Sequence, residues 1–375
     1  MQVLTLLSLL SPVAARSIMR RTTPTVKSAE VVGQVADPRI DRDSCTSTRI
    51  GDRELWTCRD SQSYPGASEG FFYSSTASWT SFNADGTPAL VDGNLTCVGD
   101  NTAAYFPIAA SECAADSGSC DDQSRWVIWP DSPPLPAPRD DGSVKLYTWI
   151  RNVHLDISNG LGPQLNPNPT ASMYRSTYTA DLAGDELPPT ELVSDSFYEA
   201  GKAAYGNYGW VVRDGTAYLY GALNGTDGTT GIGLAKVSTA TIEDLSTYQY
   251  WDPATSSWDA SQPDVTDVGK AIPNAGTGQQ GTYYYSGYFG RYVWIGSASG
   301  FPNADFYVTT AEQPEGPWEE PVLFYSGPQG TTFAGYSQQA HPGLSVEQGD
   351  GNDIYLTYTQ QNEFYNTPLV HVVWE

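Results

Sequence analysis

The sequence predicts an all-β protein, and three features of its composition support this prediction. The 375 residues include 36 Gly and 26 Pro, so turns are frequent. Aromatic residues, which favour strands, make up 12% of the chain. Charged residues are only 17%, which argues against a coiled coil, and the aromatic content argues against disorder. The formal net charge of −24 leaves too few cations to neutralise phosphates, so we expect no nucleic-acid partner.

The first 15 residues have the layout of a secretory signal peptide. The run from Met1 to Ala15 is apolar, rich in Leu and ends in small residues. Arg20-Arg21 suits a second cleavage, so a propeptide would extend to residue 21. No later segment approaches the ~20 apolar residues that a membrane span needs. We therefore predict a secreted, extracellular protein with no membrane partner.

The cysteines and two sequons agree with an extracellular location. All the cysteines lie in the first third of the chain: Cys45, Cys58, Cys97, Cys113 and Cys120. In an oxidising compartment this predicts two disulfides and one free thiol, with the pairing left open. No Cys-x-x-Cys motif and no His lies among them, so we expect no metal site. Asn94-Leu-Thr and Asn224-Gly-Thr are acceptor sites for N-glycosylation.

One sequence phrase, a Gly-containing turn followed by an aromatic or β-branched strand, occurs five times. The five copies lie at residues 51–58, 142–149, 215–221, 290–296 and 351–358. Strand-like segments precede some copies (126–129, 208–212, 282–286) and follow others (233–237, 306–310, 368–374). Five small antiparallel sheets repeated in this way predict a five-bladed β-propeller in a single domain. A β-sandwich is the alternative, but its strands recur every ~8–12 residues without a longer period.

The remaining segments complete this predicted ring. We expect a catalytic domain over residues 37–375, preceded by an N-terminal segment over residues 22–36. A strand at Glu30-Val-Val-Gly33 would join the last blade and close the ring. Residues 98–125 and 150–200 are rich in Pro, Gly, Asn and Asp and are predicted to be long loops. The Pro-rich run 130–138 is predicted to be a rigid turn.

An acidic, aromatic-rich propeller outside the cell suits a carbohydrate ligand. Tyr and Trp rings stack on sugars, and paired carboxylates cleave glycosidic bonds. No Gly-x-Ser-x-Gly, His-Glu-x-x-His or P-loop motif is present. The chain has three His, so a mechanism would depend on carboxylates or Tyr. We expect no cofactor, although a structural cation would fit the central cavity of such a ring.

The stretch Asp41-Arg-Asp-Ser-Cys-Thr-Ser-Thr-Arg-Ile-Gly-Asp-Arg-Glu-Leu-Trp-Thr-Cys-Arg-Asp60 resembles the opening of the five-bladed-propeller glycoside hydrolases. The branch most similar to it is the endo-D-arabinanase-like family, once catalogued only as a domain of unknown function. Further similar segments follow in order at residues 217–221, 233–237, 248–251, 289–294, 310–318 and 336–342, so the resemblance spans residues 37–375.

The resemblance implies that Asp43 and Asp60 are the catalytic carboxylates. One would protonate the leaving oxygen, and the other would act as nucleophile or base. The family has Gly before the second Asp, and this chain has Arg59, which places a cation beside that carboxylate. Without the resemblance, both Asp residues would pass for ordinary turn or surface residues.

Six further residues are candidates for substrate binding: Asp131, Glu199, His341, Arg175, Gln280 and Tyr208. Asp131 would also suit a turn and His341 a hydrogen-bonded core. We expect a monomeric, secreted glycoside hydrolase that cleaves a polysaccharide or oligosaccharide, such as an arabinan-type furanoside polymer. The alternatives are a polysaccharide lyase that uses Tyr or His on the same propeller, and a non-catalytic sugar-binding propeller.

Overall fold

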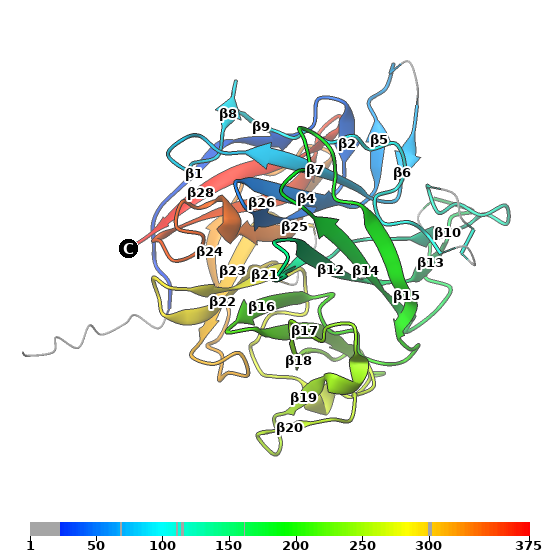
Figure 1. Cartoon of the computed structure of the whole chain (residues 1–375), viewed down its shortest axis with the longest axis vertical. Helices are drawn as coiled ribbons and strands as arrows, with labels where there is room; N and C mark the ends of the chain where they lie inside the picture. The colour runs from blue at the N-terminus through cyan, green and yellow to red at the C-terminus, as the bar shows by residue number, and fades with distance from the viewer. Residues whose placement is uncertain (1–22, 68–69, 110–111, 114–115, 161, 299–301) are drawn as a thin grey trace, which may run out of the picture.

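The computed structural model describes residues 23–67, 70–109, 112–113, 116–160, 162–298 and 302–375, and their regular structure is almost wholly β (Figure 1). Helix is limited there to three short 3-10 turns: η1 (Leu245–Thr247), η2 (Val268–Lys270) and η3 (Pro342–Leu344). The prediction of an all-β protein is confirmed. The predicted signal peptide at residues 1–15 and the propeptide to residue 21 lie outside the described residues.

Five sheets follow one another along the described chain; four are antiparallel, and the fifth also contains one parallel pair, β1 with β9. The first contains β3 (Cys45–Ile50), β4 (Arg53–Cys58) and β7 (Thr76–Ser81). The second contains β11 (Leu135–Pro138), β12 (Val144–Arg151), β14 (Ala171–Tyr178) and β15 (Thr190–Tyr198). The third contains β16 (Gly209–Arg213), β17 (Thr216–Asn224), β18 (Thr230–Ser238), β19 (Gln249–Asp252) and β20 (Ser257–Asp259).

The last two of these sheets close the series. The fourth contains β21 (Gly281–Ser286), β22 (Arg291–Gly296), β23 (Asp305–Ala311) and β24 (Val322–Ser326). The fifth contains β25 (Phe333–His341), β26 (Asp353–Gln361), β27 (Tyr365–Asn366), β28 (Pro368–Trp374), β1 (Val26–Ala36), β9 (Asn94–Thr96) and β8 (Leu90–Val91). Two small sheets lie beside them: β2 (Ile40–Arg42) with β5 (Ser61–Ser63) and β6 (Phe72–Tyr73), and β10 (Ser124–Val127) with β13 (Val153–Asp156).

The five Gly-led phrases are the second strands of the five sheets, β4, β12, β17, β22 and β26, as their spacing predicted. The glycine that begins four of these phrases has a positive φ: Gly51 (61°), Gly142 (83°), Gly215 (72°) and Gly290 (63°). Residues with a side chain rarely adopt this conformation, and the turn between first and second strand therefore requires Gly. The phrase repeated in the sequence therefore marks the turn between the first and second strands of a sheet.

The strand near the N-terminus is part of the fifth sheet. β1 pairs antiparallel with β28, and Glu30 lies opposite His371. The amide of Glu375 also donates to the carbonyl of Thr25 at 2.9 Å. The expected pairing of Glu30-Val-Val-Gly33 with the last strand is thus confirmed.

Two predictions about the second sheet were wrong. Residues 150–200 are not one long loop, because β14 and β15 lie within them and complete the sheet. The Pro-rich run is not only a turn, because its end forms β11 and pairs with β12. Pro136 and Pro138 are tolerated there because β11 is the edge strand of its sheet, where a missing N–H breaks few hydrogen bonds.

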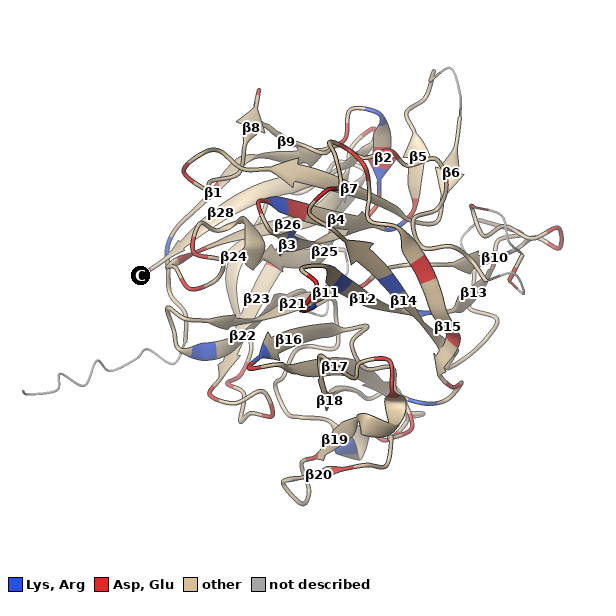
Figure 2. Cartoon of the chain, in the orientation of Figure 1, with Lys and Arg blue, Asp and Glu red and all other residues tan. Residues whose placement is uncertain are grey.

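The first strands of the sheets gather at the middle of the molecule (Figure 2). β25 contacts β3 and β21, β3 contacts β11, and β16 contacts β21. Apolar clusters join each sheet to the next, and the fifth sheet to the first. Residues of two neighbouring sheets that belong to the same cluster include Leu55 and Leu146, Trp149 and Leu219, Tyr220 and Tyr283, Phe306 and Tyr358, and Trp56 and Tyr355.

Two disulfides form, Cys45–Cys58 and Cys113–Cys120, and Cys97 is a buried free thiol. The predicted count of two bridges and one free cysteine is confirmed. The acidic residues that give the chain its charge are spread over loops around the whole molecule (Figure 2). The net charge therefore marks no single surface as a binding site.

Candidate active site

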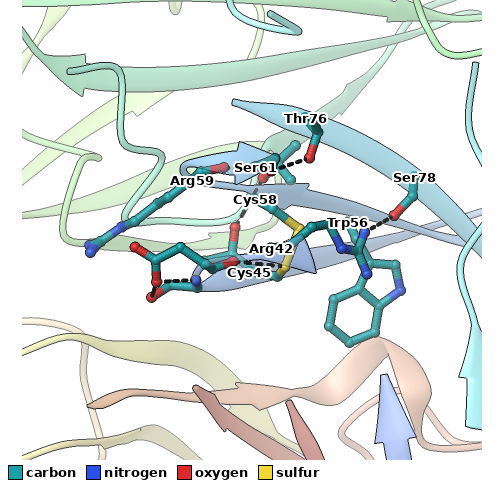
Figure 3. The surroundings of a disulfide bond; sticks show 12 residues. Arg42, Cys45, Trp56, Cys58, Arg59, Ser61, Thr76 and Ser78 are labelled. Carbon is teal, nitrogen blue, oxygen red and sulfur yellow. Dashed lines mark hydrogen bonds between the residues drawn. A yellow bond between two sulfur atoms is a disulfide. The ribbon is translucent and has the colours of Figure 1, made fainter. Parts of the chain in front are cut away.

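Asp43 and Asp60 lie at the same end of the first sheet. β3 begins two residues after Asp43, and β4 ends two residues before Asp60. The Asp43 amide donates to the Asp60 carbonyl at 2.8 Å, which extends the pairing beyond both strands. Cys45 and Cys58 are register partners, and their disulfide joins β3 to β4 (Figure 3). Each aspartate is two residues from one of these cysteines. The sheet and the disulfide together hold the two backbones side by side.

The Asp43 carboxylate has only uncharged hydrogen-bond partners. Its Oδ1 accepts from the Ser44 amide at 2.5 Å and from Ser44 Oγ at 2.8 Å. The Tyr336 hydroxyl, from β25, also donates to Oδ1. Burial and the neighbouring Asp43 raise the pKa of Tyr336, because both disfavour a phenolate. Tyr336 therefore remains a neutral donor to Asp43 at physiological pH.

The Asp60 carboxylate is held by an arginine. Arg125, on β10, donates from Nη1 to Oδ2 at 2.8 Å and from Nη2 to Oδ1 at 2.5 Å. The Arg125 Nε donates to the Ser117 carbonyl at 2.8 Å, which fixes the guanidinium plane. Two parallel hydrogen bonds from an arginine are among the strongest polar contacts in proteins and stabilise the negative charge of Asp60.

A third carboxylate, Asp131, lies between two further donors. Arg59 Nη2 donates to its Oδ1, and Gln280 Nε2 donates to the same oxygen at 3.1 Å. The Arg59 guanidinium lies 5.5 Å from the ring centre of Trp129, in cation–π geometry. We call Asp43, Asp60, Asp131, Arg59 and Arg125 the Asp–Arg cluster. It contains three acidic and two basic residues.

Serine and glutamine side chains link the cluster across the middle of the molecule. Ser44 Oγ lies 2.7 Å from Ser337 Oγ, and Ser337 donates to Gln280 Oε1. Ser44 precedes β3, Gln280 precedes β21, and Ser337 lies in the middle of β25. The cluster thus lies beside the amino ends of β3 and β21 and beside the middle of β25.

A cavity of about 230 Å³ lies at the other ends of these strands. Its lining includes Arg49 of β3, Val212 of β16 and Tyr285 of β21, each close to the carboxyl end of its strand. It does not include any residue of the Asp–Arg cluster. We therefore place the candidate chemistry at the amino ends and not at this cavity.

Four predicted site residues lie elsewhere or make other contacts. Glu199 is exposed just after β15, and the structure gives its side chain no contact with the cluster. Arg175 pairs with Glu191 at 2.5 Å and with Glu243 at 2.5 Å on the second sheet. Tyr208 is buried, and its hydroxyl donates to the Gln279 carbonyl, beside the core ring of Tyr283.

His341 is the fourth, and it belongs to a separate network in the interior. Its Nδ1 lies 2.7 Å from Ser47 Oγ and its Nε2 lies 2.6 Å from Thr357 Oγ1. Ser47 Oγ also donates to Glu54 Oε1 at 2.6 Å. Burial lowers the pKa of His341 to about 3 and raises the pKa of Glu54 to about 8. We call Glu54, Ser47, His341 and Thr357 the interior network.

The glycosylation candidates lie on strands away from the cluster. Asn94 begins β9 and Asn224 ends β17, and both are partly exposed. Across the described segments, no group of three or more His, Cys, Asp or Glu side chains is arranged to hold a metal ion. The helical turns among the described residues are too short to cross a membrane.

Two side chains that hydrogen-bond to the aspartates, Arg125 and Tyr336, were not predicted from the sequence as site residues. Arg125 lies next to the strand-like segment 126–129, but nothing in the sequence pairs it with Asp60. Tyr336 lies within a segment quoted for its resemblance, and its contact with Asp43 spans 293 positions. Neither contact has a local sequence signal, because each depends on how two separate sheets meet.

Similarity to one solved structure, the first of the three below, supports the fold, and two weaker similarities are reported with it. A presumed hydrolase from Bacteroides ovatus has a TM-score of 0.59 at 14% identity, covering 91% of this chain and 87% of that chain. A family 117 glycoside hydrolase from Zobellia galactanivorans has a TM-score of 0.48 at 11% identity, covering 94% and 90%. An exo-beta-1,3-galactanase from Phanerochaete chrysosporium has a TM-score of 0.48 at 11% identity, covering 91% and 63%.

Comparison of the sequence with known families gives the assignment. No curated protein matches the chain. One family model, described as a domain of unknown function (DUF4185), matches residues 175–371. The matched part is more than half of the 375 residues and runs from β14 to β28. The chain belongs to the DUF4185 family.

Proposed function

We propose that the protein is a five-bladed β-propeller glycoside hydrolase whose active site is the Asp–Arg cluster. The single observation that carries the proposal is that Asp43 and Asp60, at one end of the first sheet, lie in one hydrogen-bonded region with Asp131, which precedes the first strand of the second sheet. A pair of carboxylates is the usual requirement for glycoside cleavage. The five sheets, packed in series with the fifth against the first, support the five-bladed ring.

We assign different roles to the two carboxylates from their partners. Asp60 keeps its charge through two hydrogen bonds to Arg125, which suits a nucleophile or base. The hydrogen bonds that Asp43 accepts come from uncharged groups, Ser44 and Tyr336, although Arg59 also acts on it electrostatically, so we assign Asp43 to carry the proton to the leaving oxygen. Tyr336 and Ser44 would orient that carboxyl, and Asp131 with Gln280 would bind sugar hydroxyls.

The charges of the cluster favour a neutral glycan as the substrate. Arg125 is paired with Asp60 and Arg59 with Asp131, so both cations of the cluster already have an acidic partner. A substrate carboxylate would have to compete with these aspartates. An arabinan-type furanoside polymer is uncharged and fits this arrangement, and the net charge of −24 also disfavours acidic polymers.

The same observations make a polysaccharide lyase the weaker candidate. A lyase needs a base to remove a proton next to a carboxylate, and Tyr336 would have to be that base. Its raised pKa keeps the phenol protonated. His341 is fully buried in the interior network and has both ring nitrogens occupied.

Secretion is part of the proposal. The two disulfides support it, because such bonds persist in oxidising compartments. Sequencing the N-terminus of the protein from its natural source would test cleavage after residue 15 or 21. Removal of N-linked glycans would test Asn94 and Asn224.

The decisive experiment is a panel of neutral and acidic polysaccharides with analysis of the products. Saturated reducing ends are expected from a hydrolase, unsaturated ends from a lyase, and binding without products from a sugar-binding propeller.

Asp43→Asn and Asp60→Asn should each lower the rate by about 10²–10⁴, the usual contribution of an acid or base. Asp227→Asn, in the exposed turn between β17 and β18, is the matched control and should keep full activity. Folded Asp43→Asn and Asp60→Asn variants with full activity would exclude this pair.

A further inference from the structure

The hairpin that follows Asp60 is firmly attached to the first sheet at its base. Ser61 Oγ donates to the Arg59 carbonyl at 2.8 Å and lies 2.7 Å from Thr76 Oγ1 of β7. Further along, the Ser63 amide donates to the Phe71 carbonyl at 3.2 Å. Figure 1 shows β5 and β6 projecting from the body of the molecule. The positions of β5 and β6 are therefore set by the same segment that carries Asp60.

The two faces of β6 carry aromatic rings with different partners. Phe71 and Tyr73 stack on each other with ring centres 4.6 Å apart, on one face. Because successive residues of a strand point to opposite faces, Phe72 points the other way. There its ring lies 4.7 Å from the guanidinium carbon of Arg125.

Phe72 is consequently one side chain away from a proposed catalytic carboxylate. Arg125 contacts the Phe72 ring and donates two hydrogen bonds to Asp60. Phe72 is 37% exposed, so part of its ring stays open to a ligand while the Arg125 contact fixes its position.

Sugars bind aromatic rings through the apolar face formed by their C–H groups. We propose that Phe72 is a substrate-binding residue that stacks on a sugar unit beyond the cleaved bond, on the Asp60 side. The inference rests on the proposed function. It adds that the substrate is a chain long enough to reach from the Asp–Arg cluster to the β5–β6 hairpin, so that long glycans are preferred over short ones.

Oligosaccharides of increasing length, prepared from the polymer that the panel identifies, test this preference. Phe72→Ala should lower kcat/KM for the longer members by about tenfold, the size of one aromatic contact. The loss should be clearly smaller for a short aryl glycoside that does not reach Phe72, so the ratio of kcat/KM between long and short substrates should fall. Phe72→Tyr should retain the preference, because its ring can stack in the same way. An unchanged ratio of long to short substrates in Phe72→Ala would overturn the inference.

A matched control and a binding measurement separate this inference from the proposed function. Leu90 on β8 is as exposed as Phe72, at 38%, and Leu90→Ala should not change the length preference. An equal effect of Leu90→Ala would contradict a specific role of Phe72.

Affinity electrophoresis in a gel that contains the polymer measures binding without cleavage when the protein carries Asp43→Asn. Adding Phe72→Ala to this variant should reduce the extent to which the polymer slows its migration. Full cleavage by Asp43→Asn would refute the catalytic pair but not the Phe72 subsite. An unchanged length preference in Phe72→Ala would refute the subsite but not the catalytic pair.

Discussion

Two polar networks lie along β3, one just before its first residue and one within it, and their acidic groups have different partners. In the Asp–Arg cluster the acids are partly exposed, and Asp60 and Asp131 pair with arginines, as Asp60 does with Arg125 at 2.5 Å. In the interior network Glu54 and His341 are fully buried and have hydroxyl groups as hydrogen-bond partners. Burial there favours the uncharged forms, so the pKa of the acid rises and the pKa of the base falls.

This difference suggests a catalytic role for the Asp–Arg cluster and a structural role for the interior network. Charged carboxylates at the amino ends of the first strands are available to a substrate and are stabilised by counter-charges. The interior network supplies hydrogen bonds to polar groups that are buried away from water. Among the described residues, Glu54 Oε2 has no hydrogen-bond partner. Changes in the cluster should therefore alter catalysis, and changes in the interior network should alter the pH dependence of stability.

The largest effect on stability should come from His341 at acidic pH. The unfolded chain binds a proton near pH 6.5 and the folded chain only near pH 3, so stability falls as the pH drops through this range. The loss from this residue should reach about 4 kcal/mol between pH 6.5 and 3. Chemical unfolding of wild type and His341→Gln across this range checks it, because the variant lacks this component. Equal pH slopes in both proteins would contradict a neutral interior network.

The Cys45–Cys58 disulfide should have the next largest effect. It closes 13 positions of chain, and its loss should lower the free energy of unfolding by about 3 kcal/mol. Activity should fall as well, because the bond holds the backbones of Asp43 and Asp60 together. The double variant Cys45→Ser/Cys58→Ser is compared with Cys97→Ser, which removes a cysteine but no bridge. A double variant as active as Cys97→Ser would show that β-pairing alone positions the carboxylates.

Glu54 should act in the opposite pH direction from His341. The unfolded chain loses the Glu54 proton near pH 4.5 and the folded chain near pH 8, so stability falls as the pH rises between these values. Glu54→Gln cannot ionise and should remove about 2.5 kcal/mol of this fall between pH 5 and 7. Denaturant titrations at the two pH values measure the difference. The prediction fails if the variant and wild type respond equally to pH.

The smallest effect is expected for Arg175, which was a candidate for substrate binding. It forms surface ion pairs with Glu191 and Glu243, and such pairs contribute at most about 1 kcal/mol. Arg175→Ala should therefore leave kcat/KM within twofold of wild type and shift the melting temperature only slightly. A large loss of activity would place a substrate contact on the second sheet, outside the Asp–Arg cluster.

The second strands could be predicted from the sequence because each follows a Gly-containing turn and is rich in β-branched and aromatic residues. β11 escaped prediction because its prolines are typical of turns, and only its edge position permits them. β14 and β15 were hidden within a stretch of turn-forming residues. Local composition thus identified hairpins but not strands whose stability depends on the sheet around them.

The candidate site could be predicted only where its residues lie beside strands that the sequence revealed. Asp43, Asp60, Asp131 and Gln280 meet this condition, and the structure brings them into one hydrogen-bonded region with Arg59 and Ser337. Glu199 was chosen for its position along the chain alone, and it is exposed at another place. The contact of Arg125 with Asp60 required knowledge of how β10 lies against the first sheet.

The pairing of β1 with β28 has a consequence for how the chain folds. Val26 lies opposite Trp374, so one sheet unites segments separated by nearly the whole sequence. Contacts of such long range form late, because a large loop must close before they stabilise anything. During synthesis from the N-terminus, β1 lacks this partner until residues 368–374 have left the ribosome. We therefore expect the fifth sheet to form last.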